Sequence, residues 1–184
     1  EYGLGQIGWH SGYTFEQKAE LYEDIVEARH NRFGMVASAN FQHPGDVEHF
    51  SNSSEPSDGL WTNQYLAAQC YRYAVTQSKD AKAKALRSFE ALERLYMVTP
   101  PDRWGLMART VVPIDQMPKS ANWHASTTPG FTDWAWNGDT SADQITGYYY
   151  ALPLFIDHVA ETKDEKTRAL RMLQGTMDYI MENN

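Results

Sequence analysis

Two segments of the chain begin alike: Asp58-Gly59-Leu60-Trp61-Thr62-Asn63-Gln64-Tyr65, and Trp136-Asn137-Gly138-Asp139-Thr140-Ser141-Ala142-Asp143-Gln144-Ile145-Thr146-Gly147-Tyr148. Each places carboxylate, amide and aromatic side chains at the point where a helix would start. Each then continues into a stretch that is apolar in nearly every direction, which is typical of a helix buried on all sides. The two segments therefore predict buried helices over about 58–76 and 140–160.

Each of these stretches is followed by a linker and a charged, amphipathic stretch. Over about 80–97 and 163–182, apolar residues fall on one stripe of a helix and charged residues occupy much of the rest. Capping boxes at Thr14-Phe15-Glu16-Gln17 and Thr162-Lys163-Asp164-Glu165 mark the starts of the first and last helices. The alternation of buried and half-exposed helices predicts an all-α fold, an α/α toroid of helical hairpins. A plain bundle would make every helix amphipathic.

The domain organisation follows from this pattern. Residues 1–13 are rich in Gly, Tyr and Trp and read as an N-terminal segment or as the end of a preceding domain, and residues 14–184 read as the toroid portion. Because two inner helices do not close a ring, we expect the chain to be an incomplete portion of a toroid that extends past Asn184.

The remaining stretches read as loops. Gly34 is expected to end the first helix, and residues 38–57 contain turn-forming residues. Residues 99–137 form a long, aromatic-rich excursion, in which Val111 and Val112 suit a short strand. A loop of this length inside a compact domain is usually functional or disordered, and its aromatic residues favour order.

Composition excludes several classes of function. The net charge of −8 argues against a nucleic-acid partner, and no run of 18 apolar residues exists to span a membrane. Cys70 is the single cysteine and is expected to be a buried, inert thiol. The chain shows no histidine pair at helical spacing and no phosphate-binding loop, so we expect no metal and no cofactor. The sequon at Asn52 predicts glycosylation and gives weak support for secretion.

Further runs of sequence carry a resemblance to a known family. They are Leu21-Tyr22-Glu23, Ala28-Arg29-His30-Asn31-Arg32, Gln69-Cys70-Tyr71-Arg72-Tyr73-Ala74-Val75-Thr76 and Phe89-Glu90-Ala91-Leu92-Glu93-Arg94-Leu95. With the two opening segments, they resemble a family of mostly uncharacterised, secreted proteins with a six-hairpin glycosidase-like α/α toroid, often fused after a β-propeller. The resemblance covers roughly residues 15–182 and follows the order of the chain. One departure is Pro100-Pro101-Asp102-Arg103-Trp104, which stands where a Gly-Ile-Pro-Gly-Phe-like turn is expected.

The resemblance implies a carbohydrate-active protein that is secreted, or periplasmic. Its expected partner is a polysaccharide or oligosaccharide, bound at the N-termini of the inner helices. A glycoside hydrolase or a polysaccharide lyase is the implied enzyme, although toroids host several chemistries. The alternatives are a non-catalytic extracellular binding module and a structural or self-assembling module, with the rest of a larger chain or a second copy as partner.

Three aspartates are the candidate catalytic residues, because cleavage of a glycosidic bond uses one carboxyl as an acid and another as a base or nucleophile. Asp139 is the first choice, with Asp58 on the other buried helix as its distant partner. Asp143 falls at the third helical position if Thr140 is the N-cap, so capping explains it more simply. Asp58 also suits an N-cap role.

Aromatic and basic residues are the candidate substrate-binding residues. Arg suits a uronic carboxylate, and tryptophan faces stack on sugar rings, but the same residues also pack loops against a domain. The candidates are Trp61, Trp104, Arg109, His124, Trp134, Trp136 and Tyr148.

Overall fold

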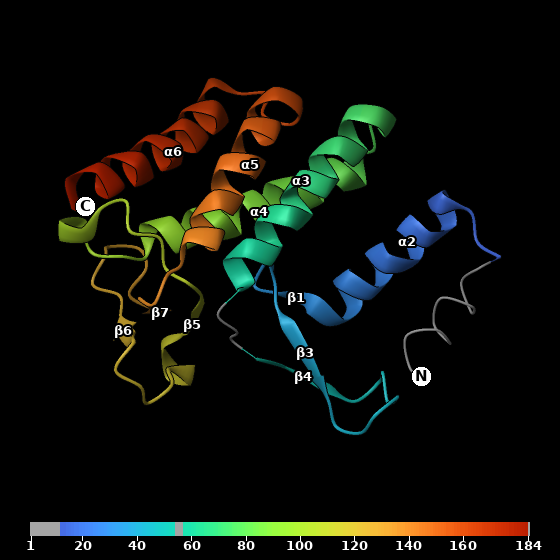
Figure 1. Cartoon of the computed structure of the whole chain (residues 1–184), viewed down its shortest axis with the longest axis horizontal. Helices are drawn as coiled ribbons and strands as arrows, with labels where there is room; N and C mark the ends of the chain where they lie inside the picture. Colours follow the sequence, from blue (N-terminus) through green and yellow to red (C-terminus); the bar gives the residue numbers. More distant parts are fainter. Residues whose placement is uncertain (1–11, 54–56, 184) are drawn as a thin grey trace.

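A computed structural model of the chain describes residues 12–53 and 57–183. The structure is 58% helical and also contains seven strands in three small antiparallel sheets (Figure 1). The prediction of an all-α toroid is therefore wrong, and the fold is mixed α/β. The strands are two to four residues long, and so short a run shows no clear alternation of apolar and polar residues. Strands β3 to β7 form within the stretches read as loops, whereas β1 and β2 lie on either side of Gly34, where the first helix was expected to end.

The helices of the described residues lie close to the predicted positions. They are α2 (Phe15–Ile25), α3 (Asp58–Thr76), α4 (Lys79–Met97), α5 (Ala142–His158) and α6 (Lys163–Asn183). Short helical turns are η1 (Val26–His30), η2 (Pro101–Arg103) and η3 (Ile114–Gln116). Both capping boxes are confirmed by reciprocal hydrogen bonds, at Thr14 with Gln17 and at Thr162 with Glu165. The first helix ends at Ile25, well before Gly34, because the chain passes through the π-helical turn η1 into a strand.

The core lies where α3, α4 and α5 meet. Phe89 of α4 stacks on Phe155 of α5, with ring centroids 4.1 Å apart and an interplanar angle of 6°. Leu66 and Leu92, from α3 and α4, are fully buried beside them. Burying each such side chain stabilises the fold by about 1.5–3 kcal/mol.

Helices α3 and α5 run in the same direction, with their N-termini side by side (Figure 1). Their first turns approach so closely that a Cβ atom at Gly59 would lie 2.5 Å from Nε2 of Gln144. One turn later, a Cβ atom at Gly147 would lie 3.0 Å from Cβ of Asn63. The two helix starts that look alike in the sequence are therefore neighbours in space.

The expected alternation of buried and half-exposed helices is correct for α6, in which four of 21 residues are buried, and wrong for α4. Helix α4 carries eight buried residues, as many as α3, because it packs against α3, α5 and α6. Helices α3 and α5, expected to be covered on all sides, leave apolar side chains in solvent. Tyr71 is 47% exposed, Val75 84% and Tyr150 52%. A helix with apolar residues on every side can therefore leave one side exposed to solvent.

Three small sheets occupy the stretches between the helices. Strand β1 (Asn31–Arg32) pairs with β2 (Met35–Val36), and β3 (Ser38–Phe41) pairs with β4 (Phe50–Ser53). The third sheet has the order β5-β7-β6, from β5 (Val111–Pro113), β6 (Trp123–Ala125) and β7 (Trp134–Asn137). The short strand expected at Val111 and Val112 is confirmed.

The third sheet lies below the N-termini of α3 and α5, as expected of the 99–137 excursion. Nε2 of Gln144 in α5 donates a hydrogen bond to the carbonyl oxygen of Ala108 at 2.7 Å. The hydroxyl of Thr110 donates to the carboxylate of Asp58 in α3 at 2.5 Å. These contacts bring residues of the excursion to the start of both helices. In the part of the chain that the structure describes, no helix is long and apolar enough to cross a membrane.

Candidate functional site

Asp58 lies at the start of α3 and is fully buried. Its Oδ2 atom is 3.3 Å from NH2 of Arg32 and accepts a hydrogen bond from the Thr110 hydroxyl. Burial lowers the pKa of Arg32 and the charge of Asp58 opposes that shift, so the guanidinium stays ionised beside its partner. The N-cap position belongs to Ser57. Asp58 thus links β1 and α3 to Thr110, the residue before β5, and its fully buried carboxylate faces no open cleft.

Asp139 and Asp143 lie at the start of α5, close to the same arginine. NH1 of Arg109 is 3.6 Å from Oδ2 of Asp139, whose side chain is 65% exposed. Asp143 accepts a hydrogen bond from the Ser141 hydroxyl, which lowers the pKa of its carboxyl, as do nearby backbone N–H groups and the charge of Arg109. The helix begins at Ala142 after Ser141, so the expected capping box with Thr140 as N-cap is wrong. Thr140 and Ser141 are adjacent and both carry a hydroxyl group, and in the structure Ser141 occupies the N-cap position.

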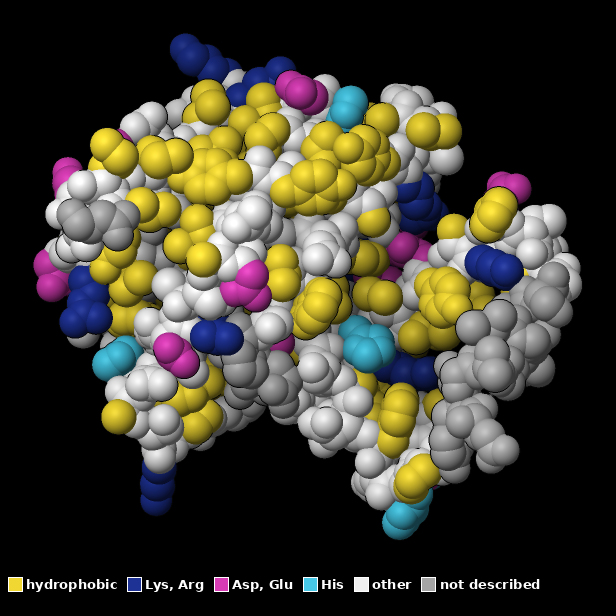
Figure 2. Space-filling model, viewed as in Figure 1, with side chains coloured by type: hydrophobic (Ala, Val, Ile, Leu, Met, Phe, Trp, Pro, Cys, Tyr) yellow, Lys and Arg dark blue, Asp and Glu magenta, His cyan; other side chains and the backbone are white. Residues whose placement is uncertain are grey.

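A groove runs between α3 and α5, beginning at their N-termini, and we call it the α3–α5 groove. Its volume is about 710 Å³. Two half-exposed tyrosines, Tyr71 and Tyr150, lie along it, and Asp143 lies at its N-terminal end. The full lining is Leu60, Gln64, Ala67, Ala68, Tyr71, Asp143, Thr146, Gly147 and Tyr150. Figure 2 shows hydrophobic side chains gathered over α3, α5 and α6.

The structure separates the predicted binding residues into accessible and packed ones. Trp136 and Tyr148 are buried, at 3% and 0% exposure, and the Tyr148 hydroxyl donates to the Leu92 carbonyl. Trp134 is half-buried between the guanidinium of Arg94, 4.5 Å from its ring centroid, and the ring of Phe33. These three side chains serve packing, the alternative that the sequence left open.

The other predicted binding residues reach solvent at separate places. His124 is exposed and packs on Trp136, with ring centroids 4.7 Å apart. Trp61 is 44% exposed on α3 but does not line the groove. Trp104 is 47% exposed and lines a second cavity of about 370 Å³ against α6, with Arg171, Gln174 and Asp178 among its neighbours. The structure therefore does not gather them into one binding surface.

Tyr71, Tyr150 and Gln64 line the groove but were not among the candidate site residues predicted from the sequence. The sequence does place the groove residues on one face of each helix. On α3 they recur at helical spacing at Gln64, Ala67, Ala68 and Tyr71. On α5 they do so at Asp143, Thr146 and Tyr150. Without the parallel arrangement of the two helices, nothing indicated that these stripes face one groove.

Two remaining predicted sites have clear local environments. Cys70 is buried, and burial raises the pKa of its thiol to about 12, which suits an inert thiol. The Asn52 side chain lies in β4, where its Nδ2 atom donates to the carbonyl oxygens of Arg29 at 2.7 Å and Ser38 at 3.2 Å. Across residues 12–53 and 57–183, no group of three or more His, Cys, Asp or Glu side chains is placed to hold a metal ion.

Comparisons of the chain with protein-family models, curated proteins and solved structures find no match. The resemblance to the six-hairpin family, and the secreted location that it implies, therefore stay predictions. The segment 1–11, which carries most of the expected N-terminal segment, lies outside the described residues.

Proposed function

We propose that the α3–α5 groove binds an oligosaccharide. The observation that carries this proposal is the combination of Tyr71 and Tyr150, both half-exposed, with the Asp143 carboxylate in one open groove. Aromatic faces suit the C–H faces of sugar rings, and a carboxylate accepts hydrogen bonds from sugar hydroxyls. The volume of about 710 Å³ lies within the range of small-molecule sites.

Binding suits the groove better than bond cleavage. Glycoside hydrolysis needs two carboxyl groups about 5–10 Å apart across the scissile bond. Among the described residues that line the groove, Asp143 is the single carboxylate. Asp58 is enclosed by Arg32 and Thr110, and Asp139 is outside the lining. The lining therefore supports recognition without a catalytic pair.

Calorimetric titration with a panel of neutral and uronic oligosaccharides tests the proposal. Tyr71→Ala and Tyr150→Ala should each weaken binding by about 3- to 10-fold, because an aromatic contact contributes about 0.5–1.5 kcal/mol. Asp143→Asn should weaken it by a similar factor. Tyr22→Ala is the matched control, since Tyr22 is 54% exposed on α2 and is not among the groove residues. Equal affinities for all four variants, or no binding by the wild-type chain, would contradict the proposal.

A second candidate function is assembly, favoured by a different observation. Apolar side chains along α6 lie in solvent seven and four residues apart, on one stripe: Leu170 at 55%, Met177 at 43% and Met181 at 74%. Sedimentation velocity across a range of protein concentrations separates the two functions. A mass that rises with concentration, in a chain that binds no oligosaccharide, would favour the assembly module.

A further inference from the structure

The charge of the α3–α5 groove has one sign. Among the described residues that line the groove, Asp143 is the single charged side chain, and none is a lysine or an arginine. Arg109 lies nearby but outside the lining, and its NH1 atom is 3.6 Å from Oδ2 of Asp139. One cation and two anions therefore give the N-terminal end of the groove a formal charge of −1.

The helix N-termini at this end are each accompanied by a carboxylate. A helix N-terminus carries a partial positive charge, which would otherwise favour an anionic ligand. At α5, the Ser141 hydroxyl and then backbone N–H groups donate to Asp143 and hold the pKa of its carboxyl below the ordinary value. The first turn of α3 contains Asp58. The Asp143 carboxylate is therefore ionised near neutral pH and offsets the positive end of its own helix.

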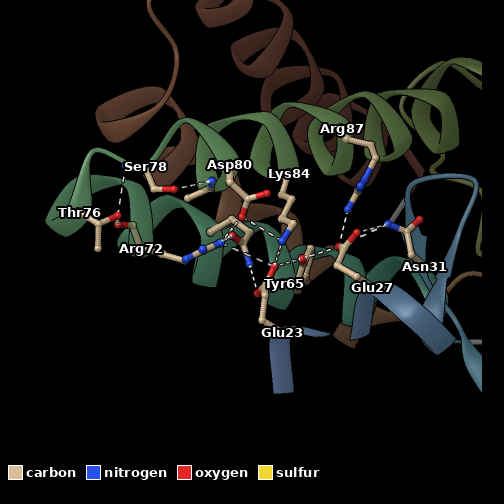
Figure 3. Close-up of polar contacts among 12 residues, drawn as sticks. Glu23, Glu27, Asn31, Tyr65, Arg72, Thr76, Ser78, Asp80, Lys84 and Arg87 are labelled. Carbon is tan, nitrogen blue, oxygen red and sulfur yellow. Dashed lines mark hydrogen bonds and ion pairs between the residues drawn. The ribbon is translucent and has the colours of Figure 1, made fainter. Parts of the chain in front are cut away.

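The cations of α3 and α4, which together form the α3–α4 hairpin, do not add positive charge to the groove. Figure 3 shows Arg72, Lys84 and Arg87 directed toward Glu23 and Glu27. Oε1 of Glu23 is 2.8 Å from Nζ of Lys84 and 3.8 Å from NH1 of Arg72. NH2 of Arg87 is 2.5 Å from Oε1 of Glu27. These cations are compensated by carboxylates, and none of them lines the groove.

The two tyrosines stand at the opposite end of the groove from Asp143. Tyr71 of α3 and Tyr150 of α5 are joined by a hydrogen bond between their side chains, which adds to burial in raising the pKa of Tyr71. Along α5, Tyr150 follows Asp143 by two helical turns, which is about 10 Å or the length of about two sugar rings. A ligand that contacts both the tyrosine pair and the carboxylate therefore contains at least two rings.

We propose that the α3–α5 groove selects a basic oligosaccharide, a chain of two or more rings that carries ammonium groups, over neutral and uronic chains. This inference rests on the proposed function of the groove and adds the substrate class. One ring lies against Tyr71 and Tyr150, and an ammonium group on another ring pairs with the carboxylate of Asp143. A uronic carboxylate in the same place is repelled by Asp143 and finds no cation in the lining. Because Asp143 is exposed, the preference is modest and is screened by salt.

Calorimetric titration of the full chain with three matched sugars tests the selection. The probes are the β-1,4-linked trisaccharides of glucosamine, glucose and glucuronic acid, which differ in charge on one type of backbone. At about pH 6 the carboxylates are ionised and the amines are largely protonated. At low salt, the glucosamine chain should bind about threefold more tightly than the glucose chain and about tenfold more tightly than the glucuronic chain. Raising sodium chloride from about 50 to 500 mM should remove most of these differences.

A substitution at Asp143 assigns the preference to the groove. In Asp143→Asn, the affinities for the three chains should lie within about twofold of one another, because the variant keeps the shape of the side chain and loses its charge. Asp115→Asn is the matched control, since it removes the same charge from an exposed residue outside the lining and should keep the wild-type order.

The possible results separate this inference from the function on which it rests. Equal binding of the three chains to the wild type, or an unchanged preference in Asp143→Asn, would overturn the selection of basic chains and leave oligosaccharide binding in place. Binding of none of the three would overturn the proposed function and this inference together.

Discussion

Asp58 contributes to the fold through contacts from which water is excluded. Its carboxylate is fully buried, and the Arg32 side chain that pairs with it is 13% exposed. Removing one partner of a buried ion pair leaves the other charge uncompensated, at a cost of about 3–5 kcal/mol. The cost is this large because a charge in the interior cannot recover its hydration.

We therefore expect Asp58→Ala to lower the free energy of unfolding by about 3–5 kcal/mol, measured by urea denaturation. Asp139→Asn is the control, since that side chain is 65% exposed and should change stability by about 0.5 kcal/mol or less. A similarly small decrease in the free energy of unfolding of both variants would show that the Asp58 contacts contribute little to stability.

The role of Asp58 illustrates what the sequence could not reveal at this scale. The position of Asp58 at a helix start was predicted correctly. Its partners were not, because Arg32 is 26 residues away and Thr110 is 52 residues away along the chain. Local rules identify a carboxylate near a helix N-terminus, and only the arrangement of β1 and β5 around α3 shows where that carboxylate points.

At the scale of elements, the loop after η2 rests directly on α6. Gly105 has φ +97°, and a Cβ atom there would lie 2.1 Å from the carbonyl oxygen of Gly175. Gly45 has a similar φ of +86° but no atom within 4 Å of such a Cβ. The two glycines therefore separate the cost of backbone strain from the cost of a steric clash.

Gly45→Ala should cost about 1–2 kcal/mol, the strain of a left-handed conformation alone. Gly105→Ala should cost about 1–3 kcal/mol more, because the loop must also move away from α6. Thermal unfolding of both variants measures the difference. Equal destabilisation of the two variants would mean that the loop can move away from α6 at no cost in stability.

Acid should release α2 from the hairpin. Burial raises the pKa of Glu23, but hydrogen bonds from Lys84, Tyr65 and Gln69 outweigh this effect and hold it below the ordinary value of 4.5. A carboxyl whose pKa is lower in the folded state stabilises that state above its ordinary pKa. This stabilisation is lost as the pH falls through the lowered value.

Between about pH 5 and pH 3, protection of residues 15–25 from hydrogen exchange should therefore fall before that of α3 to α5. In Glu23→Gln this pH dependence should largely disappear. Simultaneous loss of protection in α2, α3 and α5 as the pH falls would contradict this prediction.

The elements also differ in how well sequence predicts them. Helices α3 to α6 were predicted within about two residues at each end, because each has a long apolar or amphipathic stretch that is bounded by recognisable start or stop residues. Strands such as β5 and β6 have three residues each, which is too short for a period to be recognised. Their pairing is set by contacts such as Val111 with Trp136, across the whole excursion.

At the scale of the whole molecule, the arrangement of α3 and α5 determines which surfaces are open. The sequence correctly indicated that their N-termini share one end of the domain. It did not indicate that α4 would bury as many residues as α3, eight in each helix. The distribution of apolar residues along a helix shows which side chains are favourable to bury. Which of them are buried depends on the elements that pack against the helix.

The hydrogen bonds of Asn52 bear on the order of events in the life of the chain. Its Nδ2 atom supplies both protons of its amide group, one to Arg29 and one to Ser38. A glycan attached to this nitrogen replaces one of those protons, so the modified residue cannot keep both bonds. Attachment must therefore precede the pairing of β3 with β4. A sugar found on Asn52 by mass spectrometry would record that the transferase reached this segment before it folded.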